Sequence, residues 1–292
     1  MPPYSDREGG FVCNIAIDRY AVVRLSEGDH SSTPEAAPMV RAALRRAGLD
    51  DMAVSVACDF PVGAGLGGSS ALSAALLAAI AAWKREPIDR SAIAEAGRAL
   101  EVEELGIPGG RQDHYAATYG GGLALTFLGA TSVRRIALDA ATRDNLCSRS
   151  VLVYTGQSRI SGDTITAVLG AYKRGDATVL KALRSMRELA EAMADALEQG
   201  DLDRVGTLLG EHWAYQRSLH PSIPTERIDE IVLRAHEAGA LGAKAMGASG
   251  GGCVLILCPQ GGADAVRVAV QSLGELLDFR IDEEGVSVQD SA

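Results

Sequence analysis

Cysteine and histidine are both scarce in this chain of 292 residues, and neither is spaced for metal or disulfide chemistry. No two of the five cysteines form a Cys-x-x-Cys pair, and an odd number of cysteines cannot all be paired. The pattern predicts free, buried thiols in a reducing cytoplasm. No two of the five histidines have the spacing of zinc ligands, which argues against a zinc site. The cysteines are Cys13, Cys58, Cys147, Cys253 and Cys258.

A leader, a long apolar run and an excess of positive charge are also missing. The start, residues 1–7, has no apolar core of a signal peptide, and the apolar run at 71–83 is well short of the ~20 residues that cross a bilayer. The net charge of −10 and the pI of about 5.0 argue against nucleic acid or an anionic membrane as a partner. We therefore expect a soluble cytoplasmic monomer or homodimer that acts on a small molecule.

The most informative stretch is a glycine-rich loop that runs directly into an alanine- and leucine-rich helix. It reads Pro-Val-Gly-Ala-Gly-Leu-Gly-Gly-Ser-Ser-Ala over residues 61–71, and the helix continues to about residue 80. Glycines allow a tight turn and a close approach of the backbone to a ligand. The first turn of the helix offers unpaired amides and the positive end of the dipole. The stretch therefore predicts an anion site, and a nucleotide phosphate is the anion most often bound this way.

Two common phosphate-loop patterns do not explain this stretch. A Walker A loop would need a lysine after its last glycine, whereas Gly68 is followed by Ser69. The three glycines of the dinucleotide fingerprint are present, and Asp89 lies at about the right distance for a ribose contact. However, residues 83–89 are not the second apolar strand that such a fold requires.

The loop instead resembles the phosphate loop of the GHMP kinase superfamily, which contains galactokinase, homoserine kinase, mevalonate kinase and phosphomevalonate kinase. That resemblance implies ATP as the phosphoryl donor and Mg²⁺ as the metal. It assigns nucleotide binding to a continuous set of loop residues: Gly63, Gly65, Leu66, Gly67, Gly68, Ser69, Ser70 and Ala71.

A second segment strengthens the resemblance and narrows it to one branch. Residues 109–121 read Gly-Gly-Arg-Gln-Asp-His-Tyr-Ala-Ala-Thr-Tyr-Gly-Gly, and the sugar 1-kinase branch carries Gly-Gly-Lys/Arg-Gln-Asp-Gln-Tyr-Ala-Ala-x-x-Gly-Gly. This branch includes heptose 7-phosphate 1-kinases and fucokinase-like relatives. The resemblance implies that Asp113 lies beside the hydroxyl that is phosphorylated, and that Glu101 binds Mg²⁺ together with Ser70. Arg111 is either a contact to the sugar's own phosphate or a surface cation.

A third segment, residues 240–258, places Gly247, Gly250, Gly251 and Gly252 before a strongly apolar strand. It is similar to the third GHMP motif, which packs against the phosphate loop, and the resemblance implies that Gly250 and Gly251 contact substrate. A Thr-Gly-x-x-Arg turn ending at Arg159 occurs in heptose-kinase-like sequences, so Arg159 is either a substrate contact or a plain loop arginine.

The length and an apolar content of 47% predict two globular domains. Strands that feed helices predict an α+β fold. The resemblance implies an N-terminal domain like domain 2 of ribosomal protein S5 over residues 1–148, and a ferredoxin-like C-terminal domain over residues 149–292.

The pattern also predicts individual elements. We expect a continuous helix over residues 91–105 with Ser91 as N-cap, a helix containing His212 over 203–219, a helix over 263–277 and a hairpin at 282–285. His212 is expected to be packed or hydrogen-bonded rather than catalytic.

The resemblance implies an ATP- and Mg²⁺-dependent kinase for the anomeric hydroxyl of a sugar phosphate, and it favours D-glycero-D-manno-heptose 7-phosphate. Fucose or an octose 8-phosphate is an alternative acceptor. Relatives begin with an additional strand and a glycine-rich turn before a segment like residues 2–5. Because the present sequence starts at that segment, a catalytically silent nucleotide- or sugar-binding relative stays open as a further alternative.

Overall fold

The computed structural model describes residues 4–28, 36–157 and 162–289. The chain forms two compact units, and each is assembled from three separate segments of sequence. The first unit contains Met1–Ile15, Val62–Leu66 and Gly122–Ile281, and the second contains Ala16–Pro61, Gly67–Gly121 and Asp282–Ala292. The division at residues 148 and 149 stays a prediction from the sequence.

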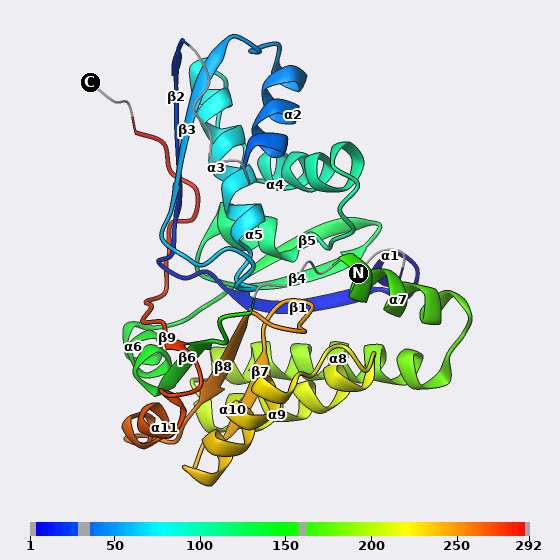
Figure 1. The fold of residues 1–292 in the computed structure, drawn as a ribbon, viewed down its shortest axis with the longest axis vertical. Helices are drawn as coiled ribbons and strands as arrows, with labels where there is room; N and C mark the ends of the chain where they lie inside the picture. The colour runs from blue at the N-terminus through cyan, green and yellow to red at the C-terminus, as the bar shows by residue number, and fades with distance from the viewer. Residues whose placement is uncertain (1–3, 29–35, 158–161, 290–292) are drawn as a thin grey trace. The chain divides into compact units, whose positions relative to one another are not determined.

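The second unit packs helices against a two-stranded antiparallel sheet, β2–β3 (Figure 1). The helix that follows the glycine loop, α3, lies beside β2 and α2, and its leucines join a core with both. Leu76 and Val54 are completely buried in this core. The elements of this unit are β2 (Ala21–Glu27), α2 (Ala37–Ala47), β3 (Met52–Cys58), α3 (Gly68–Trp83), α4 (Arg90–Ala99), the π-helical turn η1 (Leu100–Glu104) and α5 (Gln112–Tyr119).

The helix predicted over residues 91–105 needs two corrections. It begins at Arg90, because the side chain of Asp89, and not that of Ser91, accepts the amide of Ala92 and caps the helix. The α-helix ends at Ala99 and passes into η1, where the amide of Leu105 donates to the carbonyl of Leu100. Such π-helical turns occur often at functional sites.

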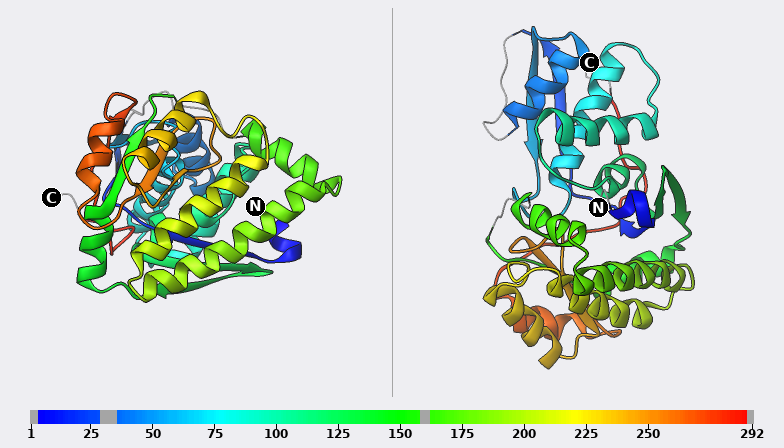
Figure 2. Two further views of the ribbon diagram at one scale, coloured as in Figure 1. Left: turned by 90° about the horizontal axis from the view of Figure 1, so that it is seen from below. Right: turned by 90° about the vertical axis from the view of Figure 1, so that its right-hand side faces the viewer.

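The first unit contains two antiparallel sheets. One has the strand order β1-β4-β5 and is covered by the long helix α8, beside which α9 runs in both views of Figure 2. The elements of the unit, apart from the second sheet and its two covering helices, are α1 (Tyr4–Glu8), β1 (Gly10–Ile15), β4 (Gly122–Leu128), β5 (Ala130–Ile136), α6 (Ala140–Arg149), α7 (Gly162–Lys173), α8 (Ala177–Glu198) and α9 (Leu202–Ser218).

The second sheet has the order β7-β8-β6-β9 and is antiparallel throughout. It consists of β6 (Ser150–Tyr154), β7 (Gly242–Ala245), β8 (Cys253–Leu257) and β9 (Glu275–Leu276), with α10 (Glu226–Glu237) and α11 (Ala263–Val270) packed on it. Numbered along the chain, these four strands lie in the order 2-3-1-4, and helices connect the first to the second and the third to the fourth. This is the ferredoxin-like arrangement that the resemblance implied.

The end of the chain differs from the prediction in two places. The helix predicted to reach residue 277 stops at Val270, and β9 follows it. Residues 282–285 form a turn without strands on either side in the described residues, and this turn belongs to the second unit. The Asp282 side chain accepts the amide of Gly285 at 2.8 Å, which closes the turn locally.

Three of the cysteines are less buried than predicted. Cys253 and Cys258 are buried, Cys13 and Cys147 are half-buried, and Cys58 is exposed; all five are free thiols. Burial raises the pKa of the Cys13 thiol to about 12, and it does the same for Cys253. No helix among the described residues is both long and apolar enough to cross a bilayer.

Candidate functional site

The first part of the glycine loop packs against the third glycine segment, within the first unit. The amide of Cys253 donates to the carbonyl of Ala64 at 2.8 Å. A Cβ at Gly65 would lie 3.0 Å from the carbonyl oxygen of Met246, and one at Gly252 would lie 2.7 Å from that of Ala64. Both glycines also have positive φ angles, of 73° and 78°. Only glycine satisfies both demands, which explains why the two glycine-rich segments occur together.

The second part of the loop turns into α3, within the second unit. Gly67 occupies the N-cap with φ 75° and ψ 22°, and its carbonyl accepts the amide of Ala71 at 2.9 Å. No side chain caps this helix end, and no acidic residue lies in its first turn. The amides of Gly68, Ser69 and Ser70 precede the first intrahelical bond and are therefore available to an anion.

Asp113 lies directly against this helix end. It is the second residue of α5, and a Cβ at Gly67 would come within 3.0 Å of its Cβ and 3.3 Å of its carboxyl carbon. The neighbouring Gln112 side chain donates to Asp113 Oδ2 at 3.4 Å. Gly67 and Asp113, which lie more than 40 positions apart in the sequence, are thus in contact, and they place a carboxylate beside a loop suited to phosphate.

Ser70 and Glu101, the predicted metal ligands, approach the same buried histidine. The Oγ of Ser70 lies 3.4 Å from Nδ1 of His114, and Oε2 of Glu101 lies 3.3 Å from its Nε2. All three residues are buried. Sequence reasoning missed His114, although one signal was available, since the resembling motif has glutamine at this position.

Glu101 is held as a carboxylate in spite of its burial. Desolvation raises the pKa of Glu101, but hydrogen bonds from His114 and Ser69 and the attraction to His114 outweigh it, so the pKa lies below its ordinary value. Oε1 of Glu101 is buried and has no hydrogen-bond partner among the described residues. A buried carboxylate oxygen without a partner is costly unless a cation or donor occupies the position opposite.

The arrangement fits Mg²⁺ better than a metal that needs a full protein cage. No group of three or more His, Cys, Asp or Glu side chains in the described part of the chain could hold a metal ion. Mg²⁺ binds hard oxygen ligands, keeps several waters and is commonly held by one or two carboxylates plus substrate phosphates. One carboxylate oxygen and one serine hydroxyl beside a phosphate-type loop meet that requirement.

The predicted substrate contacts have different surroundings. Arg111 pairs through its Nε with Glu95 at 3.3 Å, and Glu95 also accepts the hydroxyl of Tyr115 at 2.8 Å. The amide of Gly250 donates to the carbonyl of Ile223, while Gly251 lies against the backbone of Gln157. Arg159 lies outside the described residues.

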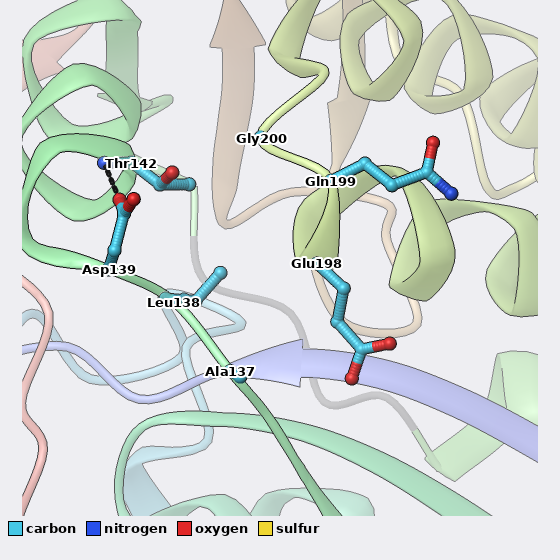
Figure 3. A pocket seen from close by; sticks show the side chains of 7 residues that line it. All are labelled: Ala137, Leu138, Asp139, Thr142, Glu198, Gln199 and Gly200. Carbon is cyan, nitrogen blue, oxygen red and sulfur yellow. Dashed lines mark hydrogen bonds between the residues drawn. The ribbon is translucent and has the colours of Figure 1, made fainter.

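A shallow pocket of ≈ 370 Å³ in the first unit contains none of the predicted site residues (Figure 3). Its two carboxylates already have partners, because Asp139 caps α6 through the amide of Thr142 and Glu198 pairs with Arg134. We assign no function to it. It is lined by Ala137, Leu138, Asp139, Thr142, Glu198, Gln199 and Gly200.

Comparison with known proteins matches the chain to one family. The family model of the GHMP kinases N terminal domain matches residues 35–121, and that of the GHMP kinases C terminal domain matches residues 193–276. A D-glycero-alpha-D-manno-heptose 7-phosphate kinase of Campylobacter jejuni is 30% identical over 234 residues, which cover 78% of this chain and 68% of that protein.

Two further relatives extend the comparison. A bifunctional fucokinase/GDP-fucose pyrophosphorylase of Arabidopsis thaliana is 27% identical over 79% of this chain and 22% of its own length. The crystal structure of a D-glycero-D-manno-heptose 1-phosphate kinase from Bacteroides thetaiotaomicron superposes with a TM-score of 0.78 at 23% identity, covering 99% of this chain and 94% of that one. The similarity to this crystal structure establishes the fold of the chain.

Proposed function

This chain belongs to the GHMP kinase family, and from that premise we propose that it transfers the terminal phosphoryl group of ATP to the anomeric hydroxyl of D-glycero-D-manno-heptose 7-phosphate. The observation that carries the proposal is the contact of Asp113 with Gly67 at the first turn of α3. This contact supports the proposal because it holds a carboxylate beside the loop that we propose to bind the phosphates.

The loop residues hold the phosphates in this proposal. Backbone amides at the start of α3 and along the glycine turn bind oxygen anions without any charged side chain. Such fixed donors stabilise the charge that develops on the transferred group, and this is the main task of the protein in phosphoryl transfer. The set comprises Gly63, Gly65, Leu66, Gly67, Gly68, Ser69, Ser70 and Ala71.

Ser70 and Glu101 are the proposed ligands of Mg²⁺. Bound Mg²⁺ neutralises phosphate charge and orients the nucleotide for in-line transfer. The chain's own part is to keep Glu101 ionised, as the hydrogen bonds from His114 and Ser69 do, and to present a buried carboxylate oxygen that is not used by the protein.

Asp113 is proposed to accept a hydrogen bond from the sugar hydroxyl, to orient it and to take its proton as the new bond to phosphorus forms. Arg111, Arg159, Gly250 and Gly251 are the proposed contacts to the sugar phosphate. The carboxylate of Glu95 accepts a hydrogen bond from Nε of Arg111 and orients the guanidinium, a group suited to binding phosphate.

A second acceptor is fucose, because one relative is a bifunctional fucokinase. The two candidates differ by the phosphate at the far end of the substrate. Replacing Arg111 by an uncharged residue would therefore slow the turnover of heptose 7-phosphate and leave the turnover of an unphosphorylated sugar unchanged.

The test is an ADP-release assay with a panel of sugars and sugar phosphates, on the wild-type chain and on Asp113→Asn. We expect turnover to be highest with heptose 7-phosphate and to fall about 10²- to 10⁴-fold in Asp113→Asn, the range for the loss of a general base. Glu103→Gln is the matched control, since Glu103 is exposed and the substitution removes one charge two residues from Glu101. Turnover that survives Asp113→Asn would remove Asp113 from the mechanism. ATP binding without turnover on any sugar would favour a silent relative.

A further inference from the structure

The side chain of a third residue, His114, lies between the two members of the proposed metal pair, Ser70 and Glu101. His114 is only 1% exposed, and its ring contacts Ser70 on one side and Glu101 on the other. Nε2 lies 3.3 Å from Oε2 of Glu101 and makes no well-aligned hydrogen bond among the described residues. The backbone of His114 is fixed as well, because the buried hydroxyl of Thr118 donates to its carbonyl.

The ring can perform this task only with a proton on Nε2. An ionised carboxylate can only accept a hydrogen bond, so Nε2 must carry the proton where it faces Glu101. Where Nδ1 carries no proton, it is an acceptor, and the hydroxyl of Ser70 donates to it. Both lone pairs of the serine oxygen are left for another ligand, as is Oε1 of Glu101. His114 thus contacts Oε2 of Glu101 and the hydroxyl proton of Ser70. It leaves Oε1 of Glu101 and the lone pairs of the serine oxygen for a cation.

The packing around the ring is specific to this side chain. A Cβ at Gly97 of α4 would lie 2.8 Å from Cδ2 of His114. The ring therefore fills the space that a glycine at residue 97 leaves open. The missing Cβ at Gly97 and the polar neighbours at both nitrogens together fix the position of the ring.

We propose that His114 is a positioning residue that orients Ser70 and Glu101 for Mg²⁺, an inference that rests on the proposed kinase function. Partners behind the ligands of a metal typically change metal affinity by about 10- to 100-fold when they are removed. The effect should therefore appear in the requirement for Mg²⁺ and not in the recognition of the sugar.

The experiment compares His114→Leu, His114→Asn and His114→Gln with the wild type. Leucine removes both polar contacts, asparagine is too short to keep both, and glutamine can donate and accept as the resembling motif does. Ser73→Ala is the matched control: the hydroxyl of Ser73 is also buried on α3, but within the described part of the chain it bonds only to the carbonyl of Ser70. Circular dichroism and the melting temperature identify any variant that does not fold.

Two readouts are used. The first is the Mg²⁺ concentration for half-maximal ADP release, together with KM for the sugar phosphate. The second is the calorimetric affinity for a non-hydrolysable ATP analogue with and without Mg²⁺, which requires no turnover. We expect the leucine and asparagine variants to raise the Mg²⁺ requirement about tenfold or more, with an unchanged affinity for the metal-free analogue. Glutamine should restore the requirement to within about threefold of the wild type.

Glu101→Gln separates this inference from the function on which it rests. If Glu101→Gln raises the Mg²⁺ requirement while the folded leucine and asparagine variants do not, the role of His114 is wrong and the metal pair stands. If none of them changes it, the metal pair itself is wrong. An equal loss in leucine, asparagine and glutamine variants, without a change specific to Mg²⁺, would make His114 a structural residue only.

Discussion

Gly67 and Gly48 adopt the same left-handed backbone conformation but have different neighbours. Their φ angles are 75° and 67°, and a Cβ at Gly48 would meet nothing within 4 Å, whereas one at Gly67 would press on Asp113. Alanine at either position should cost about 1 kcal/mol of stability through backbone strain. Only Gly67→Ala should also displace the carboxylate, and we expect it to lower kcat about tenfold or more.

Gly48→Ala is therefore the control for Gly67→Ala, and both lie in the second unit. Urea unfolding measures the loss of stability that both variants share. ADP release measures the loss of activity that is expected only in Gly67→Ala. Equal activities in the two variants would mean that the contact between Gly67 and Asp113 does not matter for turnover.

His212 gives a pH-dependent stability that is independent of the site. It lies on α9 near Lys244, with Nδ1 buried and without a hydrogen-bond partner among the described residues. Burial, helped by the charge of Lys244, lowers the pKa of His212 to about 3 from 6.5. Because the unfolded chain binds this proton and the folded one does not, the contribution of His212 is complete above pH 6.5 and is lost as the pH falls from 6.5 towards 3.

Between pH 8 and pH 5 this loss is roughly 2 kcal/mol, from 1.36 kcal/mol for each pH unit below the unfolded pKa. His212→Gln should lose that much less stability over the same interval, as measured by urea unfolding at both pH values. Parallel losses in the two proteins would contradict a neutral His212.

Among single residues, the sequence could identify the candidate site residues that belong to a recognisable motif. Asp113 and the loop could be paired because both motifs are local in sequence, and the structure brings them into contact. His114 could not be assigned in the same way. Its role depends on the π-helical turn that brings Glu101 to its ring, and no periodicity in residues 91–105 signals that turn.

The capping of α4 distinguishes the observed start of this helix from the one predicted by sequence. Asp89 accepts the amide of Ala92 at 3.1 Å, and Ser91 is exposed in the first turn. Asp89→Ala should therefore cost about 1 kcal/mol, while Ser91→Ala should change the free energy of unfolding by less than about 0.5 kcal/mol. The reverse order in urea unfolding would restore Ser91 as the cap.

Helix ends were the least predictable feature of the elements, because contacts distant in sequence decide them. The apolar pattern of α11 continues to residue 277, but Gly274 packs directly on the carbonyl of Tyr154 and the chain pairs with β6 as β9. Strand pairing thus ends a helix that local propensity would extend. The short strand β7 also escaped prediction, since its four residues only become a strand beside β8.

At the scale of the whole molecule, the two units are interleaved along the chain, and a sequence pattern cannot show this. Local signals place elements in order, so they suggested one division near residue 148. In the structure, β1 from the start of the chain pairs with β4, and residues 282–289 return to the second unit. The family models match on either side of that division, and they do not describe these exchanged segments.

The returning segment should stabilise the unit that carries Asp113, Glu101 and Ser70. Within that unit, the amide of Gly121 donates to the carbonyl of Asp282 at 2.6 Å, and the amide of Val286 donates to the carbonyl of Thr118 at the end of α5. The side chain of Val286 also packs against the core between α3 and α4. Ending the chain after Ile281 removes these bonds and should cost about 2 kcal/mol or more. Ending it after Ser287 keeps them and is the matched control, because Val288 and Gln289 are exposed.

Hydrogen–deuterium exchange measures the effect where it should occur. We expect faster exchange in α5 in the shorter chain and no change in β6 or β8, since those strands form their pairs entirely within the first unit. Since α5 carries both Asp113 and His114, loosening this helix should also reduce turnover. The stability of the first unit should be affected less. Uniformly faster exchange in both units would show that the segment stabilises the whole chain, and unchanged exchange in α5 would show that its contacts with the second unit are dispensable.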